Sequence, residues 1–464
     1  MTELFNAPGN GVPFTRGSTI SRRSLLGGAL GTAVAVGLAG CSPGSAGTPG
    51  QQASVEGAGG ADKYDGPNVA LAYWNGLTGG DGPIMKKMMT DFNAAHPNIQ
   101  VSMTATLWAD YYAKLPAAVA NGKGPEIGIM HEYSLATNAA RQVIQPLDDV
   151  ATALNMKEED FHPKVWAAGI YQGKGADAPQ RFGIPLDMHP GGLYFNKTVL
   201  EKIGEDPETA PTTGDQLMAI LEKAKSKGIQ GMWTSALSVY GLEWQTLVYQ
   251  YGGKMVNDDG TTVGWGGEEG VKALTWWKNL IDQGYSPENA AANGNDVSFQ
   301  NDKAAFMMNG PWMTTPLGEK KGLKWGAAPV PQIGDSLQTW AGAHHFVLPR
   351  QINPDANKAQ ASRVFVNWMS QHSLNWATAG MVPARKSVRD DPQFADLGAV
   401  TEFAKELDYV NFVPAVPGIQ DVDQIRNAAV SEAMLGKKDI PSALGEGAEK
   451  CNKILAANKA KYGA

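Results

Sequence analysis

The chain contains very little cysteine and no excess of basic residues. Only Cys41 and Cys451 occur among its 464 residues, so the sequence offers no disulfide framework of the kind that holds small secreted proteins together. The formal net charge is −7 at pH 7, which argues against a nucleic-acid partner, because such proteins need a basic face. Hydrophobic residues make up 43% and charged residues 18%, as is typical of a globular protein.

Motifs of several enzyme classes are also missing. The chain has no GxxxxGK[ST] nucleotide loop, and His131-Glu132 lacks the second histidine of the HExxH zinc motif. The adjacent His344 and His345 would point to opposite faces of a strand, so the two cannot hold one ion. We therefore expect no catalytic residue, no cofactor and no metal, and we predict that the protein is not an enzyme.

The N-terminus has the pattern of a bacterial export signal. Arg22-Arg23 precede a Gly/Ala-rich apolar stretch at 25–40, and Leu38-Ala39-Gly40-Cys41 closes it. A charged start, a short apolar region and small residues before a cleavage site are typical of secretory signals. The stretch is too short and too rich in glycine to span a bilayer. The last four residues resemble the bacterial lipobox, which implies a signal peptide at 1–40 and lipidation of Cys41. The paired arginines favour export by the twin-arginine route.

Residues 41–65 are predicted to be a flexible linker after the lipidated cysteine. The stretch 42–61 is rich in glycine and lacks large apolar side chains, so it cannot contribute to a core. A random coil of this length spans roughly 25 Å. We therefore expect a globular protein that is tethered to the outer face of the cytoplasmic membrane.

From Asn68 onward, predicted strands and helices alternate. Strands are predicted at 68–74, 99–107 and 126–130, and the first helix between them should end before His96-Pro97 because proline disfavours a helical neighbour. Two successive βαβ units predict an α/β fold with a parallel sheet, whose ligands bind beyond the carboxyl ends of the strands. The residues that follow these strands are therefore candidate ligand contacts: Trp74, Trp108, Asp110, His131, Glu132 and Tyr133.

Tryptophan is unusually frequent, since its 13 copies equal those of Phe and of Tyr. Helical spacing assigns Trp277 and Trp368 to the core. Trp312 instead follows the apolar run 304–308 and the chain-breaking residues Asn309-Gly310-Pro311. Further tryptophans are predicted in loops or at element ends: Trp74, Trp108, Trp233, Trp244 and Trp340.

Exposed indoles beside polar groups suit a carbohydrate ligand. Burying about 100 Å² of a sugar's apolar face on an indole contributes roughly 2–3 kcal/mol. Carboxylate, imidazole and guanidinium groups can satisfy the hydroxyl rim with charge-assisted hydrogen bonds. We predict that Trp312 is such a platform rather than the edge of a core. We name as polar candidates Asp187, Glu132, Asp110, His189, Arg385 and His345, with His344 as the alternative to His345.

Five segments together resemble one protein family. They are the lipobox, GKGPEIGIM at 122–130, FGIPLDMHPGGLYFNK at 182–197, KAAFMMNGPW at 303–312 and GMVPARKS at 380–387. In this order they resemble bacterial extracellular solute-binding protein family 1. Within that family they resemble the carbohydrate-binding proteins of the maltose-binding-protein class. The resemblance covers residues 66 to about 460.

This resemblance implies a two-lobed fold of the type II periplasmic-binding-protein kind. Each lobe would be a mostly parallel sheet flanked by helices, and a multi-strand hinge would cross near 185–187, 328–330 and 381–383. The expected lobes are residues 66–187 with 330–382, and residues 188–329 with 383–464.

The resemblance also implies a function. The protein would capture a mono- or oligosaccharide in the cleft between the lobes and deliver it to the transmembrane subunits of an ABC permease, whose ATPase is a separate chain. Trp312 would inherit the stacking role. His131-Glu132-Tyr133 and His189 depart from the maltose-type pattern, so the sugar is left open.

Other functions remain open at this point. The loop 75–82 before the first helix could bind an anion at the helix N-terminus, as a glycerophosphodiester or another polyol-type ligand would require. A secreted carbohydrate-active enzyme would need two carboxyl groups about 5–10 Å apart, and Glu126, Glu132, Asp187 and Glu243 are candidates without a shared motif. A tethered adhesion module is a third alternative.

Overall fold

The computed structural model describes residues 60–236 and 241–463. The predicted signal peptide, the lipobox with Cys41 and most of the predicted linker lie outside the described residues. The strands are β1 (Val69–Asn75), β2 (Ile99–Ala105), β3 (Ile127–His131), β4 (Ile170–Tyr171), β5 (Gln180–Arg181), β6 (Ile184–Pro185), β7 (Asp187–Pro190), β8 (Gly192–Asn196), β9 (Phe306–Asn309), β10 (Trp325–Ala328), β11 (Thr339–Gly342), β12 (His344–Val347), β13 (Val382–Pro383) and β14 (Val410–Phe412).

The helices lie between these strands and after the last of them. They are α1 (Asp81–Ala95), α2 (Trp108–Ala120), α3 (Leu135–Ala140), α4 (Asp148–Ala153), α5 (Pro163–Ala168), α6 (Lys197–Ile203), α7 (Gly214–Ser226), α8 (Leu242–Gln250), α9 (Glu268–Asp282), α10 (Gly294–Gln300), α11 (Thr314–Glu319), α12 (Ala356–Gln371), α13 (Ser373–Ala377), α14 (Lys386–Arg389), α15 (Ala399–Ala404), α16 (Ile419–Met434) and α17 (Ile440–Tyr462). Four short 3-10 helices are η1 (Glu132–Ser134), η2 (Glu158–Asp160), η3 (Pro311–Met313) and η4 (Pro392–Asp396).

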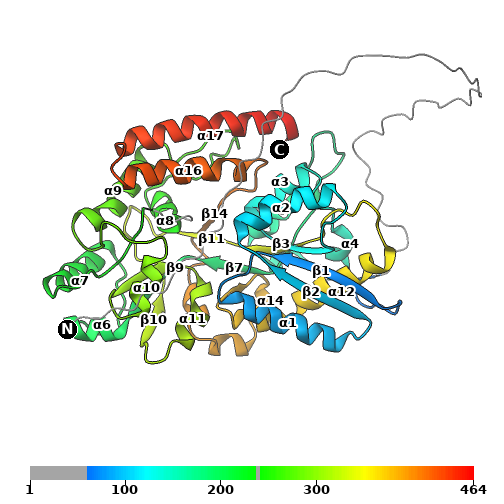
Figure 1. Ribbon diagram of the computed structural model, residues 1–464, viewed down its shortest axis with the longest axis horizontal. Coiled ribbons are helices and arrows are strands. Elements are labelled where there is room, and N and C mark those ends of the chain that lie inside the picture. The colour runs from blue at the N-terminus through cyan, green and yellow to red at the C-terminus, as the bar shows by residue number, and fades with distance from the viewer. Residues whose placement is uncertain (1–59, 237–240, 464) are drawn as a thin grey trace, which may run out of the picture. The chain divides into compact units, whose positions relative to one another are not determined.

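The first sheet has the strand order β2-β1-β3-β12-β6. Strand β1 pairs in parallel with β2 and β3, which confirms the two predicted βαβ units, and β12 runs antiparallel to β3 and β6. Helices α1 and α2 lie on opposite faces of this sheet (Figure 1). Phe92 of α1 packs with Phe365 of α12 in one core, whereas Leu115 of α2 packs in another. Helix α1 ends at Ala95, before His96-Pro97, as predicted.

The remaining large sheets are not mostly parallel, so that expectation is wrong for the second half of the fold. Strands β10, β8 and β9 pair antiparallel throughout. In the sheet ordered β13-β7-β11-β14, only β11 and β14 are parallel. Strand β9 lies beside β8 and runs in the opposite direction, so that Gly192 pairs with Asn309.

The chain passes between sheets at two adjacent places. Strands β6 and β7 belong to different sheets and are joined at Leu186, and β11 and β12 are joined at Ala343. The Leu186 N–H donates to the His344 carbonyl oxygen (2.8 Å), and the Ala384 N–H donates to the Leu186 carbonyl oxygen (3.1 Å). The change of sheet at Leu186 falls within the predicted crossing at 185–187, whereas the predicted crossing at 381–383 stays a prediction. The passage at Ala343 does not coincide with the predicted crossing at 328–330. That segment lies earlier in the chain, at the end of β10 and just beyond it. The lobe boundaries themselves remain a prediction.

The largest core surrounds helices α8, α9, α16 and α17. It includes Trp265 and Trp277, so the prediction that Trp277 is a core residue is confirmed. Trp368 is partly buried against the core that contains Phe92. Among the described residues, no helix combines the length and the apolar character that crossing a membrane requires.

Glu406 is a fully buried carboxyl group in the segment between α15 and β14. Its Oε1 accepts a hydrogen bond from the Val330 N–H (2.9 Å), and Oε2 has no hydrogen-bond partner among the described residues. Burial raises the pKa of Glu406 well above its usual 4.5. The folded protein therefore favours the protonated form of this side chain.

We expect Glu406→Gln to change how stability depends on pH. A raised folded-state pKa stabilises the wild type fully below pH 4.5, and this stabilisation is lost as pH rises toward the folded-state pKa, by up to about 1.4 kcal/mol per pH unit. Glutamine does not titrate, so the stability of the variant relative to wild type should increase from pH 5 to pH 8. Urea unfolding at both pH values measures this, and parallel pH profiles for the two proteins would contradict it.

Candidate functional site

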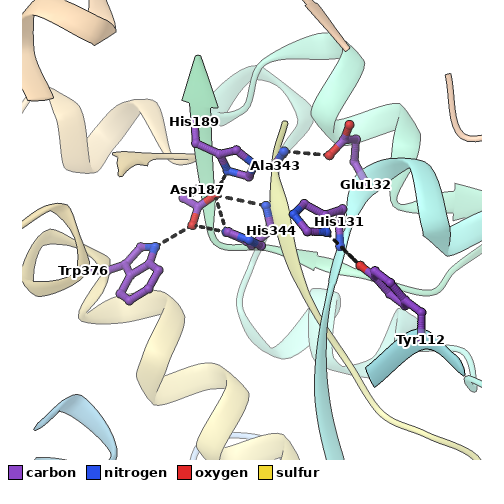
Figure 2. Close-up of polar contacts among 8 residues, drawn as sticks. All are labelled: Tyr112, His131, Glu132, Asp187, His189, Ala343, His344 and Trp376. Atoms are coloured by element: carbon purple, nitrogen blue, oxygen red, sulfur yellow. Dashed lines mark hydrogen bonds and ion pairs between the residues drawn. The ribbon is translucent and has the colours of Figure 1, made fainter. Parts of the chain in front are cut away.

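Three histidines from distant parts of the sequence converge where the two sheets meet. His131 ends β3, His344 begins β12 directly opposite it, and His189 lies in β7. Ligand-capable ring atoms of the three side chains all lie within 4.8 Å of one another. Figure 2 shows the three rings grouped beside the carboxylate of Asp187. We call His131, His189 and His344 the histidine cluster.

Asp187 orients two members of the histidine cluster. Its Oδ1 lies 3.0 Å from Nδ1 of His189, and its Oδ2 lies 2.8 Å from Nδ1 of His344. The backbone N–H of His344 and the indole N–H of Trp376 also donate to this carboxylate. Burial alone would raise the pKa of Asp187, but its contacts with His344 and His189 outweigh burial and hold that pKa well below its usual range. Asp187 is therefore an ionised acceptor, which requires a proton on each facing Nδ1.

His131 is held by a different partner. The Tyr112 hydroxyl lies 2.8 Å from Nδ1 of His131 and accepts a hydrogen bond from the His131 backbone N–H (3.0 Å). Burial, together with the neighbouring histidines, lowers the pKa of His131 well below its usual value. The same causes lower the pKa of His189 to about 4. These two rings are therefore neutral at pH 7.

Glu132 follows His131 in the chain and contacts the backbone at Ala343, where the chain passes from β11 to β12. Its Oε2 accepts a hydrogen bond from the Ala343 N–H (2.7 Å), and its own N–H donates to the Ala343 carbonyl oxygen. Burial raises the pKa of Glu132 to about 8. Its Oε1 has no hydrogen-bond partner in the described part of the chain. Glu132 Oε1 is thus available to a hydrogen-bond donor next to the passage at Ala343.

Three of the predicted tryptophans surround the histidine cluster. The Trp108 ring is stacked over His344, with 5.4 Å between ring centroids and 14° between planes. Trp312 and Trp340 lie 6.0 Å and 5.9 Å from the His189 ring. A Cβ on Gly76 would lie 1.9 Å from the Trp108 ring, so only glycine leaves room for that indole. Trp312 is partly buried against three separate cores and belongs to the interior of none of them.

The structure thus brings together eight of the residues named from the sequence. They are Trp108, His131, Glu132, Tyr133, Asp187, His189, Trp312 and Trp340. Of the alternatives His344 and His345, it is His344 that faces this group. Tyr112 and Trp376 were not named from the sequence. Trp376 contacts Asp187 although the two residues are 189 positions apart in the chain. A local sequence pattern does not reveal a contact between residues so far apart.

Four named residues lie elsewhere. Trp244 is a core residue, because it lies in α8 and not in a loop; it is 1% exposed, and its indole N–H donates to the Gly270 carbonyl oxygen. His345 points to the other face of β12, where Nε2 lies 3.2 Å from the Val165 carbonyl oxygen. Arg385 forms an ion pair with Asp160 (3.3 Å). Asp110 is exposed beside Lys114 in the first turns of α2.

The last two named residues are tryptophans at intermediate positions. Trp74 is partly buried against the core that holds Leu115, and Trp108 borders the same core. Trp233 is partly buried near Gly294, and its Nε1 has no hydrogen-bond partner among the described residues. Their roles as ligand contacts remain predictions.

Comparison with known proteins gives consistent matches. The family model of bacterial extracellular solute-binding proteins matches residues 75–373. A protein of Brucella abortus (strain 2308), whose name describes a binding protein without naming a ligand, is 23% identical over 390 residues, which cover 81% of this chain and 90% of that protein. The maltodextrin-binding protein MdxE of Bacillus subtilis (strain 168) is 25% identical over 284 residues, which cover 57% of this chain and 64% of that protein.

Among solved structures, the GacH receptor of Streptomyces glaucescens matches with a TM-score of 0.74 and 20% identity. The match covers 84% of this chain and 99% of the receptor, whose structures include a complex with acarbose. At this identity the match reports the fold alone. It confirms the predicted two-lobed α/β fold of type II periplasmic binding proteins.

We expect Trp376→Phe to destabilise the protein more than Trp244→Phe does. Both indoles are almost fully buried, and both substitutions remove the same atoms. Trp376 loses a hydrogen bond to an ionised carboxylate, worth about 1.5–3 kcal/mol, whereas Trp244 loses one to a neutral carbonyl, worth about 0.5–1.5 kcal/mol. Urea unfolding at pH 7 measures both values. Equal losses of stability would contradict the role assigned to Asp187.

Proposed function

The chain belongs to the bacterial extracellular solute-binding protein family, and from this premise we propose that it is the carbohydrate-binding component of an ABC importer. The observation that carries the proposal is the position of Trp312. Its indole is partly buried against three cores and lies beside His189, which in turn contacts the His344 ring on which Trp108 stacks.

The residues around Trp312 match the chemistry of a sugar. The indole faces of Trp312 and Trp108 would bury the apolar C–H groups of a pyranose, whereas Trp340 is 6% exposed and belongs to the largest core. Glu132 and the rings of the histidine cluster would bond its hydroxyl groups, each of which both donates and accepts. Two relatives bind such ligands by name, namely maltodextrin and acarbose, which supports the same class of ligand here.

We propose that capture occurs by closure of the two lobes about the crossings at Leu186 and Ala343. In the described conformation, the loop before α1 touches the segment that carries Trp312: a Cβ on Gly80 would lie 2.7 Å from the Trp312 carbonyl oxygen. Opening would separate these two segments and admit the ligand. Closure would then add contacts from the second lobe and exclude water, which shifts the population toward the closed form.

We further propose that the protein acts at the outer face of the cytoplasmic membrane. Export by the twin-arginine signal, lipidation at Cys41 and the flexible linker would hold it there. The closed form would deliver sugar to the transmembrane subunits of a permease, whose ATPase is a separate chain. The lobes proposed for this motion are residues 66–187 with 330–382, and 188–329 with 383–464.

A thermal-shift screen tests the ligand class. It should include mono-, di- and trisaccharides, polyols and glycerophosphodiesters, each followed by analysis of the ligand after incubation. A shift with an unchanged saccharide supports the proposal. A shift with a glycerophosphodiester alone, or the release of hydrolysis products, would contradict it.

We expect Trp312→Ala to weaken binding of the sugar identified in this screen by at least about 2 kcal/mol, or roughly 30-fold, because one stacking face is lost. Calorimetric titration measures the affinity, and the melting temperature of the ligand-free variant should stay close to that of wild type.

Trp276→Ala is the matched control, since Trp276 is also partly buried but stacks on Trp277 in α9. The control should retain wild-type affinity. Equal effects of the two substitutions on binding, or loss of the fold in Trp312→Ala alone, would assign Trp312 to the core instead.

A further inference from the structure

We propose that His131, His189 and His344 form a binding site for one divalent transition-metal ion of the zinc class. The three side chains come from three strands, β3, β7 and β12, and meet at the crossing between the sheets. This site does not depend on the sugar proposed above, and it can be tested without any sugar.

The ring nitrogens are arranged for coordination. In each ring, Nδ1 already faces a protein partner: Asp187 for His189 and His344, and Tyr112 for His131. The remaining nitrogen of each ring is Nε2. Because carboxylate oxygens of Asp187 lie within hydrogen-bonding distance of Nδ1 of His189 and of His344, Nδ1 is the donor in each ring, and Nε2 carries the lone pair that a metal ion requires.

His344 supplies a second observation. It is only 3% exposed, and its Nε2 has no hydrogen-bond partner among the described residues. A buried polar atom without a partner costs about 1–3 kcal/mol. A metal ion bonded to this nitrogen would remove that cost, whereas the aromatic neighbour Trp108 stacks on the ring and offers no acceptor or donor to its edge.

The groups behind the rings match those of known metal sites. Histidine ligands of metal ions usually donate their second N–H to a carboxylate or another oxygen, which fixes the ring and its tautomer. Asp187 fulfils this role for two rings at once, and the Tyr112 oxygen can fulfil it for the third. The carboxylate is itself held by Trp376 and by the His344 N–H.

The spacing is close to what an ion needs. Tetrahedral zinc with Zn–N bonds of 2.0–2.1 Å places its nitrogen ligands about 3.4 Å apart. Nitrogen atoms that the three rings can offer lie within 4.8 Å of one another, so they must approach by up to about 1.4 Å, within reach of small side-chain rotations. Gly342 leaves the space that His189 occupies, because a Cβ there would lie 2.3 Å from His189 Nε2.

The ligand set selects the class of ion. Three imidazoles without a thiolate suit zinc, copper or nickel better than magnesium or calcium, which prefer oxygen. Three protein ligands leave a fourth position of a tetrahedral ion for water or a hydroxyl group. Such a position would lie near Trp312 and Trp340, whose rings are 6.0 and 5.9 Å from the His189 ring.

Calorimetric titration with ZnCl₂ tests the site. Untagged protein is stripped with EDTA, dialysed and titrated at pH 7.5 without sugar. We expect one ion per chain with a dissociation constant below about 10 μM. Replacement of zinc by Co²⁺ should give the visible absorption of a tetrahedral cobalt site, a readout that requires no variant. Weaker or non-saturable binding, or the spectrum of hydrated Co²⁺, would overturn the proposal.

Substitutions locate the ion. His131→Gln and His189→Gln should each weaken zinc binding at least about 100-fold. Asp187→Asn should weaken it by about 10- to 100-fold, because the carboxylate no longer fixes the orientation and tautomer of the two rings. His96→Gln is the control, since His96 caps α1 and contacts the Phe92 carbonyl oxygen instead. Unchanged zinc affinity in both cluster variants would overturn the site even if zinc binds. Sugar binding in zinc-free protein is a separate readout, so either proposal can fail alone.

Discussion

The buried carboxylate of Asp187 is the constraint on which the centre of the molecule depends. An ionised carboxylate without water costs several kcal/mol unless its oxygens are fully bonded. Here the bonds come from β7, from β12 and from α13, through His189, His344 and Trp376. Because Asp187 directly follows the crossing at Leu186, the same contacts that neutralise it also tie together two strands that pass between the sheets.

The candidate site is a consequence of this arrangement. Two histidines are held in place by the carboxylate, and His131 joins them because β3 and β12 pair with His131 opposite His344. The aromatic residues come from different elements and complete the surroundings: Trp108 from the first turn of α2 and Trp312 from η3. With the proposed lobe boundaries, a site built at the crossings would receive side chains from both lobes, so a ligand bound there would be sensitive to their relative movement.

The sequence predicts the local features of the fold well. The two βαβ units, the end of α1 before His96-Pro97 and the burial of Trp277 follow from periodicity and from the backbone limits of proline. Prediction from the sequence fails where the structure depends on pairing between residues that are far apart in the chain. Apolar runs do not reveal that β8 and β9 pair antiparallel. Trp244 was predicted in a loop or at an element end, although α8 carries it into the core.

The site shows the same limit. Strand ends and breaker residues singled out Trp108 and Trp312, which lie beside the histidine cluster. Their role as ligand contacts stays a prediction. The histidine cluster was missed because its members come from three strands, whereas the sequence motifs for metal ligands join only near neighbours, here His344-His345 and His131-Glu132. Their contacts are set by the pairing of β3, β7, β11 and β12, which is a tertiary property.

The most direct test of the central claim is a crystal structure of the protein with the sugar that the thermal screen identifies. The account predicts a sugar ring against the face of Trp312, with His189 within hydrogen-bonding distance of a hydroxyl group. A sugar bound elsewhere, such as the surface groove between α16 and α17 that Gln424 and Lys450 line, would contradict it.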